Sequence, residues 1–233
     1  MVYAMILAGG NGTRMGSKLP KQYLLLNNKP IFIYSLEQFL LNKSIDKIII
    51  CCPMGWINYT DDIVKKYIDN TLTIDIIEGG ESRPETLMNG CNFISEKYGI
   101  KNDDIIITHD AVRPFINQRI INDNIKYTKK HGAVSTAIKA SDTIFESNDN
   151  KTISNIPIRD KLYHAQTPQS FNLKKLMSVY QSLTDDELNS LTDGCKAFIL
   201  KNKPVYLIDG EPSNIKITTP FDLILAENIL SKQ

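Results

Sequence analysis

Glycine and basic residues gather directly after the first apolar run of the chain. Residues 7–23 read LAGGNGTRMGSKLPKQY, and an apolar stretch precedes them. Glycine at the end of a strand lets the backbone come close to a bound group, because no Cβ intervenes. Arg14, Lys18 and Lys21 follow in the same stretch, and such cations bind phosphate oxygens. The spacing therefore indicates a site that holds or transfers a phosphate.

Two well-known phosphate loops do not match this stretch. A dinucleotide-binding loop reads G-x-G-x-x-G, with an acidic residue at the end of the second strand. Here Met15 replaces the third glycine, and residues 51–53 read CCP. A P-loop needs glycine followed by Lys and Ser or Thr, whereas Ser17 precedes Lys18. A plain strand–turn–helix junction with solvated surface cations stays open as the alternative.

The elements that must position these residues alternate between two patterns. Short runs rich in Ile and Val, bounded by turn residues, predict strands at 2–8, 47–52, 73–77, 104–108, 133–138 and 205–208. Longer runs with apolar residues at helical spacing predict helices at 31–41, 59–68, 83–97 and 119–130. Thr219 and Pro220 predict the start of a last helix. The alternation predicts an α/β fold, with a mostly parallel sheet covered by helices on both faces.

Three polar clusters fall at the carboxyl ends of the expected strands. They are the glycine stretch, the pair Gly79 and Gly80, and the pair His109 and Asp110. Sites in parallel sheets lie at this edge. We therefore expect the three clusters to meet at one rim.

The glycine-rich opening motif is the first of five motifs along the chain. It is followed by GGESRPET at 79–86, HDAVRP at 109–114, QTPQSF at 166–171 and NIKIT at 214–218. Together these motifs resemble those of the cytidylyltransferases that act on methylerythritol phosphate or ribitol phosphate. The resemblance covers nearly the whole chain and implies a Rossmann-like nucleotidyltransferase fold. It also implies attack of a polyol phosphate oxygen on the α-phosphorus of CTP, with release of pyrophosphate.

Three further stretches resemble the ribitol-5-phosphate branch of this family. They are IPIR at 156–159, LYHAQTPQ at 162–169 and LTDGCK at 191–196. Ala165 stands where the branch usually has Gly, and Gly194 where it usually has Ala. The implied product is CDP-ribitol, for teichoic acid or another cell-surface polymer. Methylerythritol phosphate cytidylyltransferase activity and a non-catalytic CTP-binding protein stay as alternatives.

The resemblance implies roles on the nucleotide side. Arg14 and Lys21 match the two cations that the family places on the reacting phosphates, whereas Lys18 has no counterpart and is interpreted as solvated. The residues matching the nucleotide contacts are Leu7, Ala8, Gly9, Gly10, Gly80, Glu81, Ser82, Arg83, Thr86 and Ala111.

On the other side of the reaction, the resemblance implies that Asp110 contacts Mg²⁺. One carboxylate suffices, because Mg²⁺ keeps waters and takes phosphate oxygens as ligands. Lys216 and Arg159 match the residues that hold the acceptor phosphate. Thr167, Thr192 and Asp193 are expected as lesser polyol contacts, and His109 as a structural residue.

The segment 141–160 breaks the alternation of strands and helices. Residues 142–156 read DTIFESNDNKTISNI, which predicts two short strands around an Asn/Asp turn. From the residues alone, the hairpin lies on its own domain or on a second subunit. The resemblance implies a homodimer in which this β-hairpin arm brings Arg159 to the partner's site. We treat residues 1–233 as one domain with an arm.

Composition excludes some broad classes of protein. The formal net charge is +1, so we expect no nucleic-acid or anionic-membrane partner. No apolar run approaches the ~20 residues of a membrane helix, and the N-terminus resembles a first strand, not a signal peptide. The four cysteines form no C-x-x-C pair, which favours reduced core residues. We expect a cytoplasmic protein.

Overall fold

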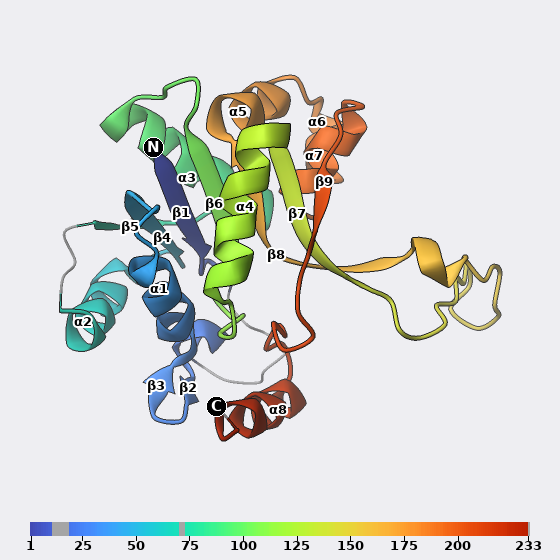
Figure 1. The fold of residues 1–233 in the computed structure, drawn as a ribbon, viewed down its shortest axis with the longest axis horizontal. Coiled ribbons are helices and arrows are strands. Elements are labelled where there is room, and N and C mark those ends of the chain that lie inside the picture. The colour runs from blue at the N-terminus through green and yellow to red at the C-terminus, as the bar shows by residue number, and fades with distance from the viewer. Residues whose placement is uncertain (11–18, 70–72, 233) are drawn as a thin grey trace.

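A seven-stranded sheet forms the centre of the molecule (Figure 1). The computed structural model describes residues 1–10, 19–69 and 73–232. Only β8 runs antiparallel to its neighbours in this sheet. In spatial order the strands are β5 (Ile74–Glu78), β4 (Lys47–Cys52), β1 (Val2–Leu7), β6 (Ile105–Asp110), β8 (Tyr163–Asn172), β7 (Ala133–Lys139) and β9 (Tyr206–Asp209).

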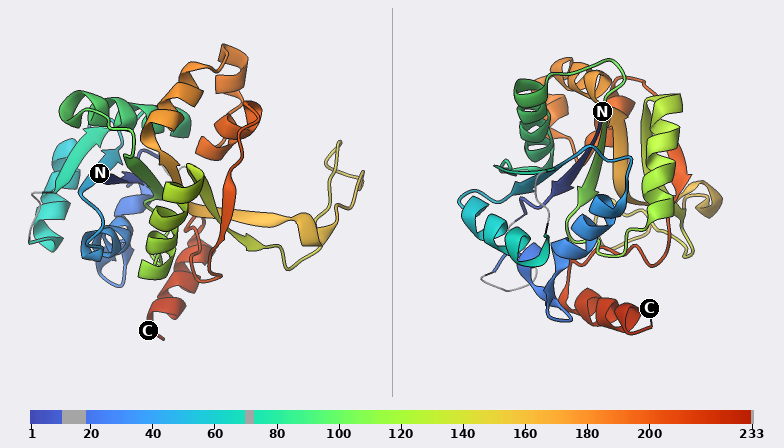
Figure 2. Two further views of the ribbon diagram at one scale, coloured as in Figure 1. Left: turned by 45° about the horizontal axis from the view of Figure 1, so that its top comes forward. Right: turned by 60° about the vertical axis from the view of Figure 1, so that its left-hand side comes forward.

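Helices cover both faces of the sheet, as the sequence predicts. The helices α1 (Ile31–Leu41), α2 (Ile57–Tyr67) and α4 (Gln118–His131) pack on one face. The helices α3 (Arg83–Tyr98), α5 (Leu173–Gln181) and α7 (Gly194–Leu200) pack on the other. The right-hand view of Figure 2 shows α3 and α4 on opposite sides of the strands. The short helix α6 (Asp185–Asn189) lies between α5 and α7 in the chain.

Alternate residues of β1 divide the core into two halves. Ala4 and Ile6 belong to the apolar cluster under α1 and α4, whereas Tyr3 and Met5 belong to the cluster under α3 and α5. Successive side chains of a strand point to opposite faces. A strand buried on both sides therefore reads as a continuous apolar run, which is the pattern that predicts β1.

A smaller cluster joins the last helix to the sheet. Helix α8 (Pro220–Leu230) begins with a capping box between Thr219 and Asp222, as the sequence predicts. Its Ala226 packs with Leu26 from the hairpin of β2 (Leu25–Leu26) and β3 (Lys29–Pro30), and with Val112 beyond β6. This packing brings the chain before α8 next to the carboxyl end of β6.

The prediction of an α/β fold is confirmed, although the structure also has elements that were not predicted. The expected strands and helices are present within a few residues of their predicted bounds. The strand β8 and the three helices α5 to α7 are not among the predicted elements. Because β8 is antiparallel, the sheet is mostly but not wholly parallel.

The segment after β7 leaves the body of the molecule as an arm (Figures 1 and 2). The prediction of two strands in this arm is wrong: a single β-bridge joins Glu146 to Asn155. The turn is held by Asp149, whose Oδ1 accepts the backbone N–H groups of Lys151 and Thr152 at 2.8 Å each. The arm residues are mostly exposed, the large apolar ones among them, so no packing within the described residues supports a longer ladder. The role of the arm in a dimer stays a prediction.

Two other observations bear on the class of protein. Within the described ranges, no helix is long and apolar enough to span a membrane. All four cysteines are free, and Cys51, Cys52 and Cys91 are buried.

Candidate active site

A cleft opens at the carboxyl ends of β1 and β6, where the three polar clusters were expected to meet. Every residue predicted on the nucleotide side lines it, apart from Arg14, which lies outside the described residues together with Lys18. Lys21, Asp110 and Lys216 line it too. Gln22 and Val112 were not predicted. The lining residues are Leu7, Ala8, Gly9, Gly10, Lys21, Gln22, Gly80, Glu81, Ser82, Arg83, Thr86, Asp110, Ala111, Val112 and Lys216.

The glycines after β1 and β5 allow their two loops to meet over one threonine. A Cβ added to Gly9 would lie 3.1 Å from Thr86 Oγ1, and one added to Gly79 would lie 3.0 Å from the same atom. Among the described residues, a Cβ at Gly10 would meet nothing within 4 Å. Gly9 and Gly79 thus permit close packing, and Gly10 lines the cleft.

The first turn of α3 lines the cleft beside these glycines. Ser82 Oγ caps the helix by accepting the N–H of Glu85 at 3.2 Å. Thr86 Oγ1 accepts the N–H of Gly80 at 3.0 Å and donates to the carbonyl of Ser82 at 2.8 Å. Glu85 Oε2 accepts the N–H of Glu81 at 2.8 Å. These contacts fix a helix N-terminus beside the cleft, which is a favourable place for an anion.

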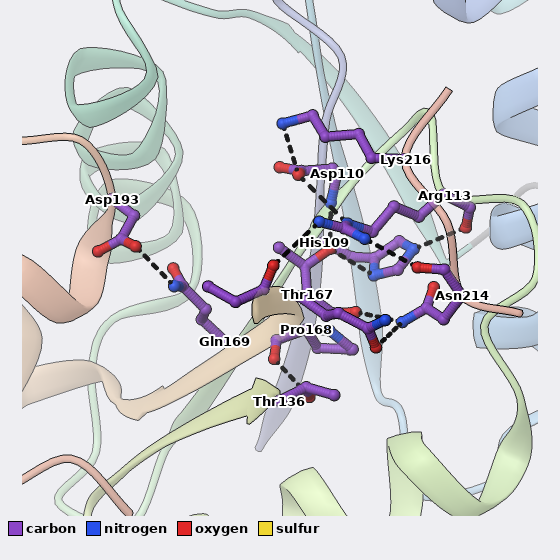
Figure 3. A network of polar contacts seen from close by, with 12 residues as sticks. His109, Asp110, Arg113, Thr136, Thr167, Pro168, Gln169, Asp193, Asn214 and Lys216 are labelled. Carbon is purple, nitrogen blue, oxygen red and sulfur yellow. Dashed lines mark hydrogen bonds and ion pairs between the residues drawn. The ribbon is translucent and has the colours of Figure 1, made fainter. Parts of the chain in front are cut away.

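Asp110 lies among three cations, of which Figure 3 shows Lys216 and Arg113. Its carboxylate lies 2.9 Å from Lys216 Nζ, 3.4 Å from Arg83 Nε and 3.6 Å from Arg113 Nε. Burial alone would raise the pKa of Asp110, but the charges of Arg83, Lys216 and Arg113 outweigh it and hold the pKa well below its usual range. Asp110 is therefore ionised at neutral pH.

Beneath Asp110, a buried chain of hydrogen bonds has one consistent proton arrangement. His109 Nε2 lies 3.0 Å from the carbonyl of Arg113, which can only accept, so Nε2 carries the proton. Nδ1 is then an acceptor and takes the hydroxyl proton of Thr167 at 3.1 Å. Thr167 Oγ1 in turn accepts the backbone N–H of Asp110 at 3.1 Å. Burial lowers the pKa of His109 to about 4, which keeps the ring neutral.

A second set of buried contacts holds the loop that carries Lys216. Arg113 Nη1 donates to the carbonyl of Asn214 at 2.8 Å, and Asn214 Nδ2 donates to the carbonyl of Thr167 at 2.9 Å (Figure 3). Asn214 is completely buried. Lys216 thus reaches Asp110 from a loop that is fastened to β8. Arg113 and Asn214 both belong to motifs of the sequence, HDAVRP and NIKIT, but no role was predicted for either residue.

Three residues that were predicted to contact the polyol do not line the cleft that the described residues form; they are Thr167, Thr192 and Asp193. Thr167 is 3% exposed and lies under Asp110. Asp193 caps α7 through the N–H of Lys196 at 2.9 Å and accepts from Gln169 Nε2 at 3.1 Å. Thr192 precedes it on an exposed stretch.

Arg159 lies on the arm, away from the cleft of its own chain. It begins a short 3₁₀ helix, Arg159–Lys161, and it is exposed. Its Nη1 donates to the carbonyl of Ser141 at 3.4 Å. A role for Arg159 in a site therefore requires another subunit, in line with the prediction from the family, which stays a prediction.

Comparisons of the whole sequence with known proteins point to one family. A family model described as 2-C-methyl-D-erythritol 4-phosphate cytidylyltransferase (IspD) matches residues 2–232. The chain is 48% identical over 234 residues to the ribitol-5-phosphate cytidylyltransferase of Lactiplantibacillus plantarum, covering 100% of both proteins.

Solved structures show the same fold. The 4-diphosphocytidyl-2C-methyl-D-erythritol synthase of Anaerococcus prevotii superposes with a TM-score of 0.81 at 29% identity, over 99% of this chain and 96% of that one. The 2-C-methyl-D-erythritol 4-phosphate cytidylyltransferase of Francisella tularensis gives 0.80 at 31% identity, over 97% of each chain. The chain belongs to the IspD family of cytidylyltransferases and is a nucleotidyltransferase.

Proposed function

We propose that this protein transfers CMP from CTP to D-ribitol 5-phosphate, giving CDP-ribitol and pyrophosphate. The observation that carries the proposal is the 48% identity, over the full length of both chains, to a ribitol-5-phosphate cytidylyltransferase. The stretches IPIR, LYHAQTPQ and LTDGCK support the same acceptor. Methylerythritol phosphate is the second candidate, because the family model and the matched solved structures carry that name.

In this proposal the cleft acts by positioning CTP and stabilising charge. The backbone of Gly10, which lines the cleft, and the first turn of α3 would hold the nucleotide and its phosphates. Lys21 lines the same cleft, and with Arg14 it would face the oxygens on which negative charge grows during transfer. Loss of one such donor costs on the order of 10² to 10³ in turnover.

The acceptor phosphate would be held at the rim by Lys216. Its side chain is 39% exposed, and its amine lies 2.9 Å from Asp110. The carboxylate keeps the cation at the edge of the cleft, where an incoming phosphate can replace or share the contact. Ala111 would lie against the ribose, and Thr192 and Asp193 would border the polyol.

Asp110 is also the residue that we propose as a magnesium ligand. No group of three or more His, Cys, Asp or Glu side chains in the described ranges could hold a metal alone. An ionised carboxylate beside the cleft fits an ion that takes its other ligands from phosphates and water. Bound Mg²⁺ would supply charge neutralisation on the triphosphate.

Pyrophosphate release tests the proposal directly. The purified chain is incubated with CTP, Mg²⁺ and either ribitol 5-phosphate or methylerythritol phosphate. Release with ribitol 5-phosphate supports the proposal, and release with methylerythritol phosphate alone overturns it. Tight CTP binding without release on either acceptor would favour a non-catalytic protein. A Lys216→Met variant tests the acceptor side of the site: it should raise KM for the acceptor and leave KM for CTP nearly unchanged.

We further propose a cytoplasmic homodimer in which Arg159 completes the partner's site. Arg159 is exposed on the arm, and the arm extends away from the body of the molecule (Figure 1), which supports this arrangement. Arg159→Met and Lys216→Met chains are mixed under conditions that allow subunit exchange, and they are assayed at a low acceptor concentration at which each variant alone turns over little. If Arg159 acts across the interface, each mixed dimer has one intact site and activity returns. No recovery despite mixed dimers, or a fully active monomer, would contradict the proposal.

A further inference from the structure

The short 3₁₀ helix η2 (Lys21–Tyr23) carries a cation into the cleft beside two buried side chains. Lys21 is half-buried and lines the cleft. Gln22 and Tyr23 are 1% and 2% exposed. A turn this short has few hydrogen bonds of its own, so the contacts of these two buried neighbours contribute to the position of Lys21.

Tyr23 fastens one side of the turn to the helices α1 and α2. Its ring stacks on Trp56 with the centroids 5.3 Å apart and 14° between the planes. It also meets Phe32 edge-on at 5.7 Å. The Tyr23 hydroxyl lies 2.7 Å from Thr60 Oγ1. These contacts fix the turn to the body of the protein, away from the cleft.

Gln22 fastens the other side of the turn to the glycine segment. Its Nε2 donates to the carbonyl of Ala8. The N–H of Ala8 still pairs with Cys51 O at 2.9 Å, but Ala8 lies beyond the end of β1 and is only 2% exposed. A buried carbonyl at the end of a sheet needs a donor, and Gln22 supplies it.

We propose that Gln22 is a positioning residue of the transfer reaction. Its carboxamide helps to fix the distance between Lys21 and the backbone that follows Ala8, including Gly10. Nothing in the family resemblance assigned this residue a role. The inference rests on the proposed function, in which Lys21 stabilises charge on the reacting phosphates.

The expected effect follows from the flexibility of lysine. A cation on a four-carbon stem stabilises the transition state only if the backbone beneath it is fixed. A misplacement of about 1 Å can cost on the order of 10² in rate. Without the Gln22 amide, the turn loses its side-chain hydrogen bond to the glycine segment, so the distance from Lys21 to that segment is fixed less tightly.

The first test compares two variants that each remove a donor from a buried backbone carbonyl. Gln22→Met keeps the length of the side chain but leaves Ala8 O unpaired. Tyr34→Phe is the matched control, because the Tyr34 hydroxyl donates to Leu26 O at 2.6 Å and lies outside the cleft. Gln22→Met should lower kcat about 10- to 100-fold with a much smaller change in KM for CTP, whereas Tyr34→Phe should lower only the melting temperature.

A double-mutant cycle asks whether Gln22 acts through Lys21. If it does, Gln22→Met should cost little further turnover in a Lys21→Met background, because the cation that it positions is already gone. Equal losses of kcat with and without Lys21 would overturn the proposal. So would a Gln22→Met enzyme with the kcat of the unmodified protein.

A second readout does not depend on turnover. An amine-reactive reagent labels Lys21, and mass spectrometry follows its rate with and without CTP. Gln22→Met should change the labelling rate of Lys21, and Tyr34→Phe should not; an unchanged rate overturns the proposal. If the unmodified protein accepts neither polyol phosphate, the proposed function fails, while the labelling still decides whether Gln22 fixes Lys21.

Discussion

Replacing Asp110 by Asn should destabilise the fold as well as the reaction. The carboxylate lies among Arg83, Arg113 and Lys216, so the Asn variant leaves these cations facing one another without a counter-charge. Arg113 is the decisive partner, since its side chain is only 10% exposed. Removing one member of a buried pair costs ~3–5 kcal/mol. The contact with the more exposed Lys216 is screened by solvent, so we expect a loss of about 3 kcal/mol.

The pH dependence of this loss has a definite sign. The three cations hold the pKa of Asp110 below its usual range in the folded protein, whereas an unfolded Asp titrates near ~3.9. A carboxyl with a depressed folded pKa contributes stability above the unfolded pKa and loses it as the pH falls through the folded pKa. The difference between Asp110 and Asn should therefore be constant from neutral pH down to about pH 5 and shrink below about pH 4.

Urea unfolding curves at several pH values would measure this difference. Asp149→Asn is the control: its pKa is also depressed, chiefly by the backbone N–H groups of Thr152 and Lys151, but it lies exposed on the arm. That variant should leave unfolding of the core unchanged. If the Asp110→Asn protein is as stable as the parent at pH 7, or the gap widens as the pH falls, the assignment of a buried ionised carboxylate is wrong.

Three further variants test the supports of the site. Asn214→Ala removes the donor to Thr167 O at 2.9 Å and should raise KM for the acceptor by loosening Lys216, as measured by pyrophosphate release. Thr167→Val strips the partner from the Asp110 N–H and should cost about 1–3 kcal/mol in urea unfolding. Ser82→Ala removes the cap of α3 and should cost about 1 kcal/mol and weaken CTP binding measured by calorimetry.

The sequence predicts the strands that consist mostly of apolar residues. Residues 47–52 read KIIICC and form β4 as expected. Residues 163–172 read YHAQTPQSFN, and β8 buries Gln166, Thr167, Gln169 and Ser170. Several of these polar groups bond to partners far away in the sequence; for example, Ser170 Oγ donates to Asn124 Oδ1 at 2.7 Å. A hydrophobic pattern cannot reveal a strand whose partners come from elsewhere in the chain.

The same distinction applies to the site. The glycines, Asp110 and Lys216 could be predicted as neighbours, because each follows a strand end or belongs to a recognisable motif. Gln22 and Asn214 act from behind them, on backbone carbonyls of Ala8 and Thr167. Such contacts depend on how loops cross in three dimensions. The position of Gln22 and Asn214 in sequence motifs therefore does not reveal which carbonyl each side chain bonds to.

The reversed direction of β8 explains how one edge of the sheet serves both the cleft and the arm. β7 runs parallel to β6, so both strands end at the edge that holds Asp110. β8 starts at this edge as it returns from the arm, and its Thr167 meets the backbone of Asp110. A parallel β8 would have to enter from the opposite edge and could not place the arm beside the cleft. The segment that carries Arg159 therefore leads directly into the strand whose Thr167 bonds to the backbone of Asp110, which gives the proposed dimer a structural connection to the site.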